Sequence, residues 1–194
     1  MASTAAPYGL RPVRSLIGGG YVSGNTRQYK VTNSYGTSIF YGDIVNLDAN
    51  GLIIKSTSTA DMVNAVGVFL GCEYTDPNLN YKLHRNMWLA STVATDVVAY
   101  VCDDPYMIYQ AQSDTTMAQT GLGLNYAIVQ TAGNTAIGVS KVAVDGDTGA
   151  TTNTLPVRVI GFVDGPDSAV GDAYTDVLIM INSGINRHLN SQGL

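Results

Sequence analysis

The chain has 194 residues, of which 45% are hydrophobic and only 13% are charged, and its formal net charge is −5. This length is sufficient for a packed core, and low charge combined with high hydrophobicity excludes global disorder. The sequence contains no run of 18 apolar residues, so we expect no membrane span. Residues 1–20 lack the apolar segment of a secretory signal peptide, so we expect none.

The composition favours strands over helices. The chain holds 14 Asp but a single Glu, Glu73, together with four Lys, 21 Gly and 12 Tyr. Strong helix formers are therefore scarce among its polar residues. Gly, Asp, Tyr and β-branched residues are typical of strands joined by tight turns. We predict an all-β protein, with a β-barrel or sandwich body of short antiparallel strands and an extended N-terminal arm.

The charge is distributed unevenly along the chain. Residues 1–42 hold four bases and no acid, a charge of +4, whereas residues 43–194 hold six bases against fifteen acids, a charge of −9. A basic head on an acidic body indicates a binding partner, although chance is the alternative with so few bases. Four dispersed bases on an acidic body do not suit nucleic acid, because phosphates would be repelled.

The first 25 residues resemble an arm more than part of a core. Residues 6–12 contain two prolines that impose extended geometry, and Gly18 to Gly20 interrupt the chain again. Apolar residues are nevertheless interspersed, as in an arm that orders against a surface. We predict an arm over 1–25 and a β-rich body over 26–194, with a C-terminal sub-region from about 150. A strand packed against its own domain remains the alternative for the arm.

Strand patterns and turn signals alternate from residue 26 onward. Asn-Gly or Asp-Gly turns are predicted at 50–51, 145–146 and 164–165. One stretch, 113–119, resembles a helix start with Ser113 as its cap. Strands are predicted over 66–74, 97–102, 106–112, 137–144, 157–163 and 177–181.

Reactive side chains show no pattern typical of an enzyme. The two histidines, His84 and His188, have the surroundings of surface or interface residues, and no Gly-x-Ser-x-Gly motif is present. The acids lie mainly at predicted turns, which explains the preference for Asp without invoking a catalytic pair. We therefore predict no catalytic residues and no cofactor.

Metal and disulfide patterns are equally weak. Cys72 and Cys102 lie in strand-like runs and match no zinc spacing, so we interpret them as buried hydrophobes and leave their pairing open. An oxygen-rich ion site at Asp103 and Asp104, or at Asp145 and Asp147, also stays open, although we predict no metal.

Four fragments in order resemble a known family. They are Tyr35–Leu47, Gly51–Ile53, Ala65–Tyr74 and Ala99–Pro105. Their layout, which spans about residues 8 to 182, resembles the capsid cement (head decoration) proteins of tailed bacteriophages, particularly aquatic podovirus-like phages and cyanophages. The resemblance implies a non-enzymatic, mainly β protein on the outer surface of the virion capsid. It implies a homo-oligomer, with a trimer favoured over a dimer, that binds the major capsid protein.

The sequence and the resemblance together predict a capsid cement protein whose N-terminal residues contact the shell. Neither a nucleic acid nor a membrane is an expected partner. The alternative is a tail- or fibre-associated β-module that binds host glycan, with Trp88 and either Tyr81 or Tyr106 as its aromatic platform. The role of the C-terminal tail, residues 185–194, stays open. The predicted capsid contacts are Tyr8, Leu10, Arg11, Arg14, Arg27 and Tyr29.

Overall fold

The structure is a computed structural model that describes residues 4–17, 25–62 and 64–182. His188, Gly18 to Gly20 and the C-terminal tail lie outside this part of the chain. The described residues form antiparallel sheets with two short 3-10 turns, which confirms the all-β prediction. The sheets remain open, with edge strands on both main sheets, so the sandwich and not the barrel is the form adopted by the described residues. None of their helices has the length and apolar character to cross a membrane.

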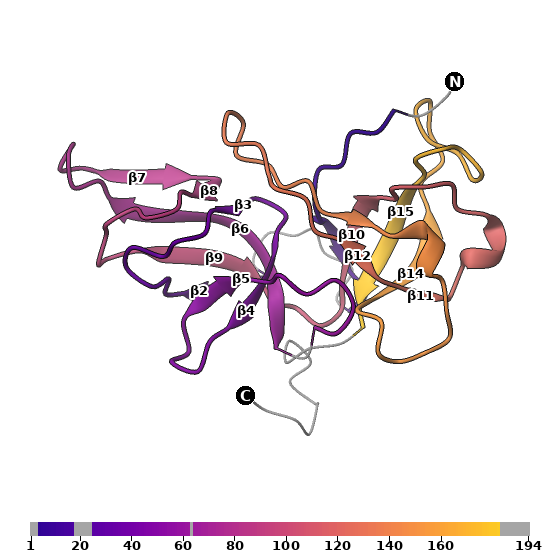
Figure 1. The fold of residues 1–194 in the computed structure, drawn as a ribbon, viewed down its shortest axis with the longest axis horizontal. Coiled ribbons are helices and arrows are strands. Elements are labelled where there is room, and N and C mark those ends of the chain that lie inside the picture. Colours follow the sequence, from indigo (N-terminus) through magenta and orange to yellow (C-terminus); the bar gives the residue numbers. More distant parts are fainter. Residues whose placement is uncertain (1–3, 18–24, 63, 183–194) are drawn as a thin grey trace.

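The first main sheet has five strands in the order β1-β10-β15-β14-β11. All four pairings are antiparallel, and β1 lies at one edge. In Figure 1 this sheet occupies the right-hand half of the molecule. Its strands are β1 (Arg11–Ser15), β10 (Met107–Gln112), β11 (Asn125–Tyr126), β14 (Val157–Phe162) and β15 (Asp176–Ile181).

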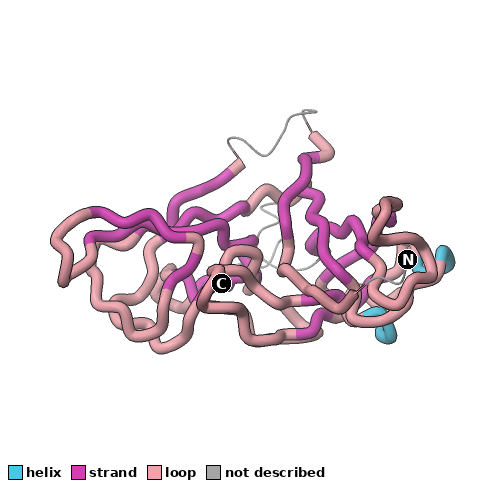
Figure 2. Tube along the Cα trace, turned by 90° about the horizontal axis from the view of Figure 1, so that it is seen from above, coloured by secondary structure: helices cyan, strands magenta, loops and turns pink. Residues whose placement is uncertain are grey.

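The second main sheet has six strands and forms the left-hand half. Its order is β2-β9-β6-β4-β5, and β7 pairs with the far end of the long strand β6. Figure 2 shows the strands of the two halves as separate groups connected by loops. The strands are β2 (Thr26–Tyr29), β4 (Ile44–Leu47), β5 (Ile53–Lys55), β6 (Ala65–Thr75), β7 (Lys82–Arg85) and β9 (Val98–Cys102).

Short elements complete the fold. Two strand pairs cover the main sheets: β3 (Ile39–Phe40) with β8 (Met87–Trp88), and β12 (Ile128–Val129) with β13 (Ala143–Val144). The 3-10 turns are η1 (Gln119–Gly121) and η2 (Gly146–Thr148).

Two hydrophobic cores follow from this arrangement. One core lies against the five-stranded sheet and also receives Ile44, Val68 and Cys102 from the six-stranded sheet. The other lies on the opposite face of the six-stranded sheet, around Phe69 and Trp88. Alternate residues of β4 and β6 thus serve different cores, since successive side chains of a strand point to opposite faces. The six-stranded sheet therefore joins the two halves.

Most predicted strands and the turn signals at 50–51 and 145–146 agree with the structure, whereas the turn predicted at 164–165 lies at 166–167. Two further local predictions were wrong. Residues 113–118 form no helix, and Gln119 only begins the 3-10 turn η1, because Ser113 and Asp114 donate backbone hydrogen bonds to the carbonyls of Thr175 and Val144. The predicted strand over 137–144 is reduced to β13, because the chain turns at Gly138, which has a φ of +70°. Both segments are held by contacts distant in sequence.

The predicted arm is extended, but its described residues 4–15 contact their own chain. Strand β1 pairs antiparallel with β10 inside the five-stranded sheet, and Thr4 and Ala6 are hydrogen-bonded to Gln112. The alternative of a strand packed on its own domain therefore describes residues 4–15. Likewise, β14 and β15, which follow residue 150, are hydrogen-bonded neighbours of β11 and β10 in the same sheet.

Candidate functional site

The N-terminal segment is fastened where the two halves meet. The Leu10 amide donates to the Gly42 carbonyl at 2.9 Å, and the Gly9 amide donates to the Val142 carbonyl at 3.2 Å. Gly9 has a φ of +75°, and a Cβ there would lie 2.6 Å from Ser140 Cβ. Leu10 has no exposed surface. The prediction of Leu10 as a capsid contact is therefore corrected: its side chain fills this protein's own core.

The side-chain amide of Gln112 binds the backbone of the residues that precede Gly9. Its Nε2 donates to the Thr4 carbonyl at 3.1 Å, and its Oε1 accepts a hydrogen bond from the Ala6 amide at 2.7 Å. One side chain thereby occupies a donor and an acceptor of the extended backbone, as a neighbouring strand would. No local sequence signal marks Gln112 for this role.

Tyr8 and Arg11 interact with each other. The Arg11 guanidinium carbon lies 4.7 Å from the centre of the Tyr8 ring, which is a cation–π geometry. Burial, and then the nearby Asp176 carboxylate, raise the pKa of Tyr8 above its ordinary value. Tyr8 is half-buried, whereas Arg11 is exposed. Of this pair, Arg11 presents more of its surface to a partner.

Arg14 is exposed on β1 and has no partner among the described residues. It follows an irregularity in the β1–β10 register, between Pro12 and Arg14. Proline, charge and irregular pairing are features with which proteins prevent uncontrolled pairing at a sheet edge. Arg14 is the predicted contact residue that the fold leaves most available.

Arg27 and Tyr29 lie on the edge strand of the other sheet and share one carboxylate. Arg27 Nε lies 3.2 Å from Asp103 Oδ2, and the Tyr29 hydroxyl donates to the same oxygen at 2.7 Å. Burial, followed by the contact with Asp103, raises the pKa of Tyr29 to about 12. These two predicted contacts therefore attach β2 to the turn after β9. Four of the six predicted residues thus lie on two sheet edges, Leu10 lies in the core, and Tyr8 is half-buried ahead of β1.

A buried polar cluster, which the sequence did not predict, lies at the junction of the halves. Asp43 has no exposed surface and accepts hydrogen bonds from the Phe40 amide at 2.9 Å and the Ser140 hydroxyl at 2.6 Å. Lys55 Nζ lies 2.9 Å from Asp43 Oδ2. Each carboxylate oxygen thus has a partner, as a buried charge requires. The cluster has no access to solvent suited to substrate binding, so we interpret it as structural.

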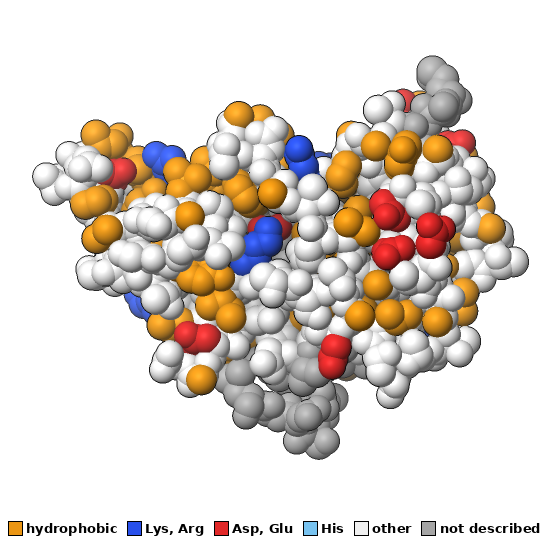
Figure 3. All heavy atoms as spheres, in the orientation of Figure 1, with side chains coloured by type: hydrophobic (Ala, Val, Ile, Leu, Met, Phe, Trp, Pro, Cys, Tyr) orange, Lys and Arg blue, Asp and Glu red, His pale blue; other side chains and the backbone are white. Residues whose placement is uncertain are grey.

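The two sites considered for an ion have other partners. Asp103 is engaged by Arg27 and Tyr29, as described above. Burial raises the pKa of Asp145, as do the carboxylates of Asp114 and Asp147 to a smaller extent. Figure 3 shows acidic side chains gathered on the right-hand half. In the part of the chain that the structure describes, no three His, Cys, Asp or Glu side chains form a metal-binding group.

The cysteines are free thiols, and both are buried. This answers the open question of their pairing. Burial raises the pKa of Cys72 to about 12 and also raises the pKa of Cys102. Since the thiolate is the reactive form, neither cysteine has the environment of a nucleophile.

The aromatic residues of the alternative glycan site are not together. Trp88 is fully buried and packs edge-on against Tyr74, so its predicted role in a glycan platform is corrected. Tyr81 and Tyr106 are 54% and 39% exposed, and they precede β7 and β10, which belong to different sheets.

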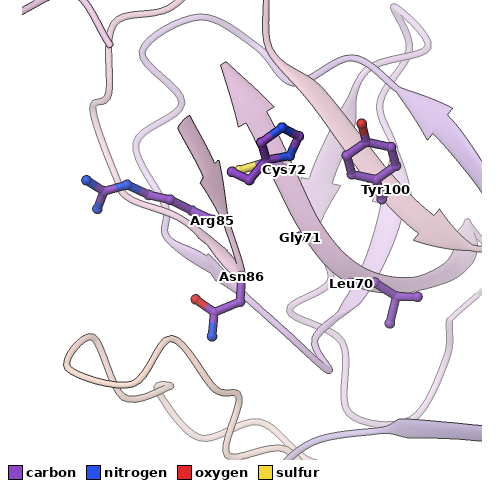
Figure 4. A pocket seen from close by; sticks show the side chains of 7 residues that line it. Leu70, Gly71, Cys72, Arg85, Asn86 and Tyr100 are labelled. Carbon is purple, nitrogen blue, oxygen red and sulfur yellow. The ribbon is translucent and has the colours of Figure 1, made fainter. Parts of the chain in front are cut away.

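A shallow hollow of about 280 Å³ is present over the six-stranded sheet, where Gly71 interrupts the β6–β9 register. Figure 4 shows Tyr100 and the side chains of Arg85 and Asn86 around Gly71. A Cβ at Gly71, whose φ is +141°, would lie 2.8 Å from the Arg85 carbonyl. The hollow therefore depends on glycine at this position.

Comparison with known proteins gives no relative. No family model matches the chain, and neither the curated proteins nor the solved structures contain a match to it. The function must therefore be argued from the chain itself.

Proposed function

We propose that this protein is a structural component of a virion: a capsid cement protein of a tailed bacteriophage. It binds the outer surface of the assembled head, bridges neighbouring major capsid protein subunits and stabilises the shell. It acts as a homo-oligomer, a trimer in preference to a dimer, and performs no catalysis. Cement stabilises a particle because it binds assembled subunits better than separate ones.

The observation that carries the proposal is the basic, open edge of an acidic protein. Strand β1 is an edge strand, and both of its arginines, Arg11 and Arg14, are exposed. The remainder of the chain after residue 42 is acidic. Such an edge presents positive charge to an acidic partner surface. An icosahedral shell repeats that surface many times. Repetition allows weak contacts to give firm attachment through an oligomer.

Charge reversal tests this proposal more sharply than deletion of the arm, since deletion would also remove Leu10 from the core. We expect Arg11→Glu with Arg14→Glu to reduce the ratio of this protein to the major capsid protein on purified heads. Lys141→Glu is the matched control, because Lys141 is exposed and lies outside β1. Unchanged occupancy of the double variant, with folding confirmed by circular dichroism, would contradict the role of this edge.

A second candidate is a tail- or fibre-associated β-module that binds host glycan. The hollow at Gly71 favours it, because Tyr100 and His84 offer rings and Asn86 offers an amide around one small depression. Labelling of this protein in intact virions separates the two candidates. A signal over the whole shell supports cement, and a signal at a single vertex supports the tail module.

A further inference from the structure

The end of the β6–β7 hairpin is a rigid projection. We call residues 76–81 the hairpin tip. Asp76 Oδ1 accepts hydrogen bonds from the amides of Asn78 at 2.9 Å and Leu79 at 3.2 Å. The Asn80 amide donates to the Asp76 carbonyl at 2.9 Å, and the Asp76 amide donates to the Tyr81 carbonyl at 3.1 Å. These bonds fix the turn from within, as aspartate at the start of a turn commonly does.

The rigid tip presents two large apolar side chains. Leu79 is 52% exposed and Tyr81 is 54% exposed. Strand β6 has eleven residues, and its pairing with β7 carries the tip away from both cores. Figure 1 shows this projection at the far left, and Figure 3 shows hydrophobic side chains along it. A tip ordered in advance loses little conformational entropy on binding, and large apolar side chains of this kind act as anchors.

A second apolar surface lies at the end of β1. We call Leu16, Ile17 and Tyr106 the N-terminal patch. Their exposed fractions are 55%, 63% and 39%. The Leu16 amide donates to the Tyr106 carbonyl at 3.0 Å, so the two segments lie side by side. Arg14, which has no partner among the described residues, is two positions before Leu16.

The tip and the patch belong to different sheets and lie apart in Figure 1, where β7 is at the left end and β10 is in the right half. The tip of one molecule therefore does not meet its own patch. Each surface has one rim charge without a partner among the described residues, and the two are opposite: Asp76 Oδ2 at the tip and Arg14 beside the patch. The other rim charges are already engaged, Lys82 by Glu73 and Asp104 by the Asn25 side chain and the Tyr106 amide. Opposite charges at a rim favour the correct encounter between two surfaces.

We propose that the hairpin tip of one copy docks on the N-terminal patch of a second copy, with Leu79 and Tyr81 against Leu16 and Ile17 and with Asp76 near Arg14. The contact is heterologous, so each copy uses one tip and one patch. Repetition of such a contact by rotation closes a ring. This inference rests on the proposed homo-oligomer and names its interface.

Two complementary variants test this contact through molar mass by light scattering after size exclusion. We expect the wild type to have a multiple of the 20.5 kDa chain mass. Leu79→Ser with Tyr81→Ser should give the monomer, as should Leu16→Ser with Ile17→Ser. Val93→Ser is the control, because Val93 is also 54% exposed but belongs to neither surface. Thermal unfolding followed by circular dichroism identifies folded variants.

Mixing the two monomeric variants is the decisive step. Each retains one intact surface, so a heterologous contact gives a one-to-one dimer of twice the chain mass and nothing larger. A mixture that remains monomeric would overturn the proposal, as would a wild type that is monomeric at millimolar concentration or a tip variant that keeps the wild-type mass. Occupancy on heads is measured separately: docking in solution without binding to heads would refute cement and leave this contact standing. If the protein binds heads but the tip variant keeps the wild-type oligomer, cement stands and this contact is refuted.

Discussion

Lys55 Nζ lies 2.9 Å from Oδ2 of Asp43, a carboxylate with no exposed surface. The Ser140 hydroxyl donates to the other oxygen of the same carboxylate at 2.6 Å. Three segments that are distant in sequence therefore depend on one buried charge at the junction of the two halves. Breaking such a pair is costly because the remaining group keeps its desolvation without its partner.

We expect Asp43→Leu to reduce the free energy of unfolding by roughly 3–5 kcal/mol, since Lys55 would be left without its counter-charge. The double variant Asp43→Leu with Lys55→Met should lose less than the single variant, because no charge then remains unpaired. Urea denaturation measures both. Equal losses in the single and double variants would show that the ion pair is not the cause.

Gly9→Ala tests the close approach of the N-terminal segment to the junction. The new Cβ would lie 2.6 Å from Ser140 Cβ and 2.7 Å from the Gly42 carbonyl oxygen. Gly51→Ala is the matched control, because Gly51 has a similar φ of +74° but open space around its Cβ position. We expect Gly51→Ala to cost about 1 kcal/mol through backbone strain alone and Gly9→Ala to cost clearly more. Similar losses in urea denaturation would mean that the packing at Gly9 is loose.

Stability should fall in alkaline solution. Burial raises the pKa of Cys72 from its ordinary 9.0 to about 12, and the pKa of Tyr29 from 10.0 to about 12. For a group whose pKa is raised by folding, the stabilisation is complete below the unfolded pKa and is lost as the pH rises toward the folded pKa. Between pH 8 and 10.5, Cys72 alone should remove roughly 2 kcal/mol. Urea denaturation at both pH values measures the loss, which Cys72→Ala should reduce; an unchanged pH dependence would contradict this assignment.

The two thiols should resist labelling in the native protein. Cys72 and Cys102 are buried, and their raised pKa values leave little thiolate at pH 8. We expect a thiol-specific reagent to modify both residues rapidly in 8 M urea and at least about a hundredfold more slowly without it, because native reaction requires an opening of the fold. Rapid native labelling of either cysteine would show that its strand is exposed in solution.

A double-mutant cycle examines the rim of the proposed contact between copies. Arg14→Gln alone and Asp76→Asn alone should each weaken self-association about two- to fivefold, the range that an exposed ion pair supports, and asparagine keeps the side-chain oxygen that accepts the hydrogen bonds of the turn. The double variant should weaken self-association little more than either single variant, because both changes remove the same ion pair. Sedimentation equilibrium measures the association. Weakening in the double variant equal to the sum of the two single effects would show that Arg14 and Asp76 do not interact across the contact.

Several features of this protein were determined by the sequence alone. The alternation of apolar residues over 66–74 and the β-branched run over 97–102 predicted β6 and β9, and Asn50-Gly51 predicted the turn between β4 and β5. Burial of both cysteines also agreed with their interpretation as core residues. These features are local, because strand periodicity and turn geometry depend on residues close together in the chain.

The sites, by contrast, were decided by the tertiary structure. Asp43 and Ser140 are 97 positions apart, and Gln112 lies 106 positions from Ala6, so no spacing in the sequence marks either pair. Arg27 and Tyr29 were predicted to contact a partner, but the fold brings Asp103 to both. Leu10 was predicted at the surface, yet the pairing of β1 with β10 places it in the core. Sheet pairing joins distant segments, and only that pairing determines which polar groups satisfy one another inside the protein and which remain available to a partner.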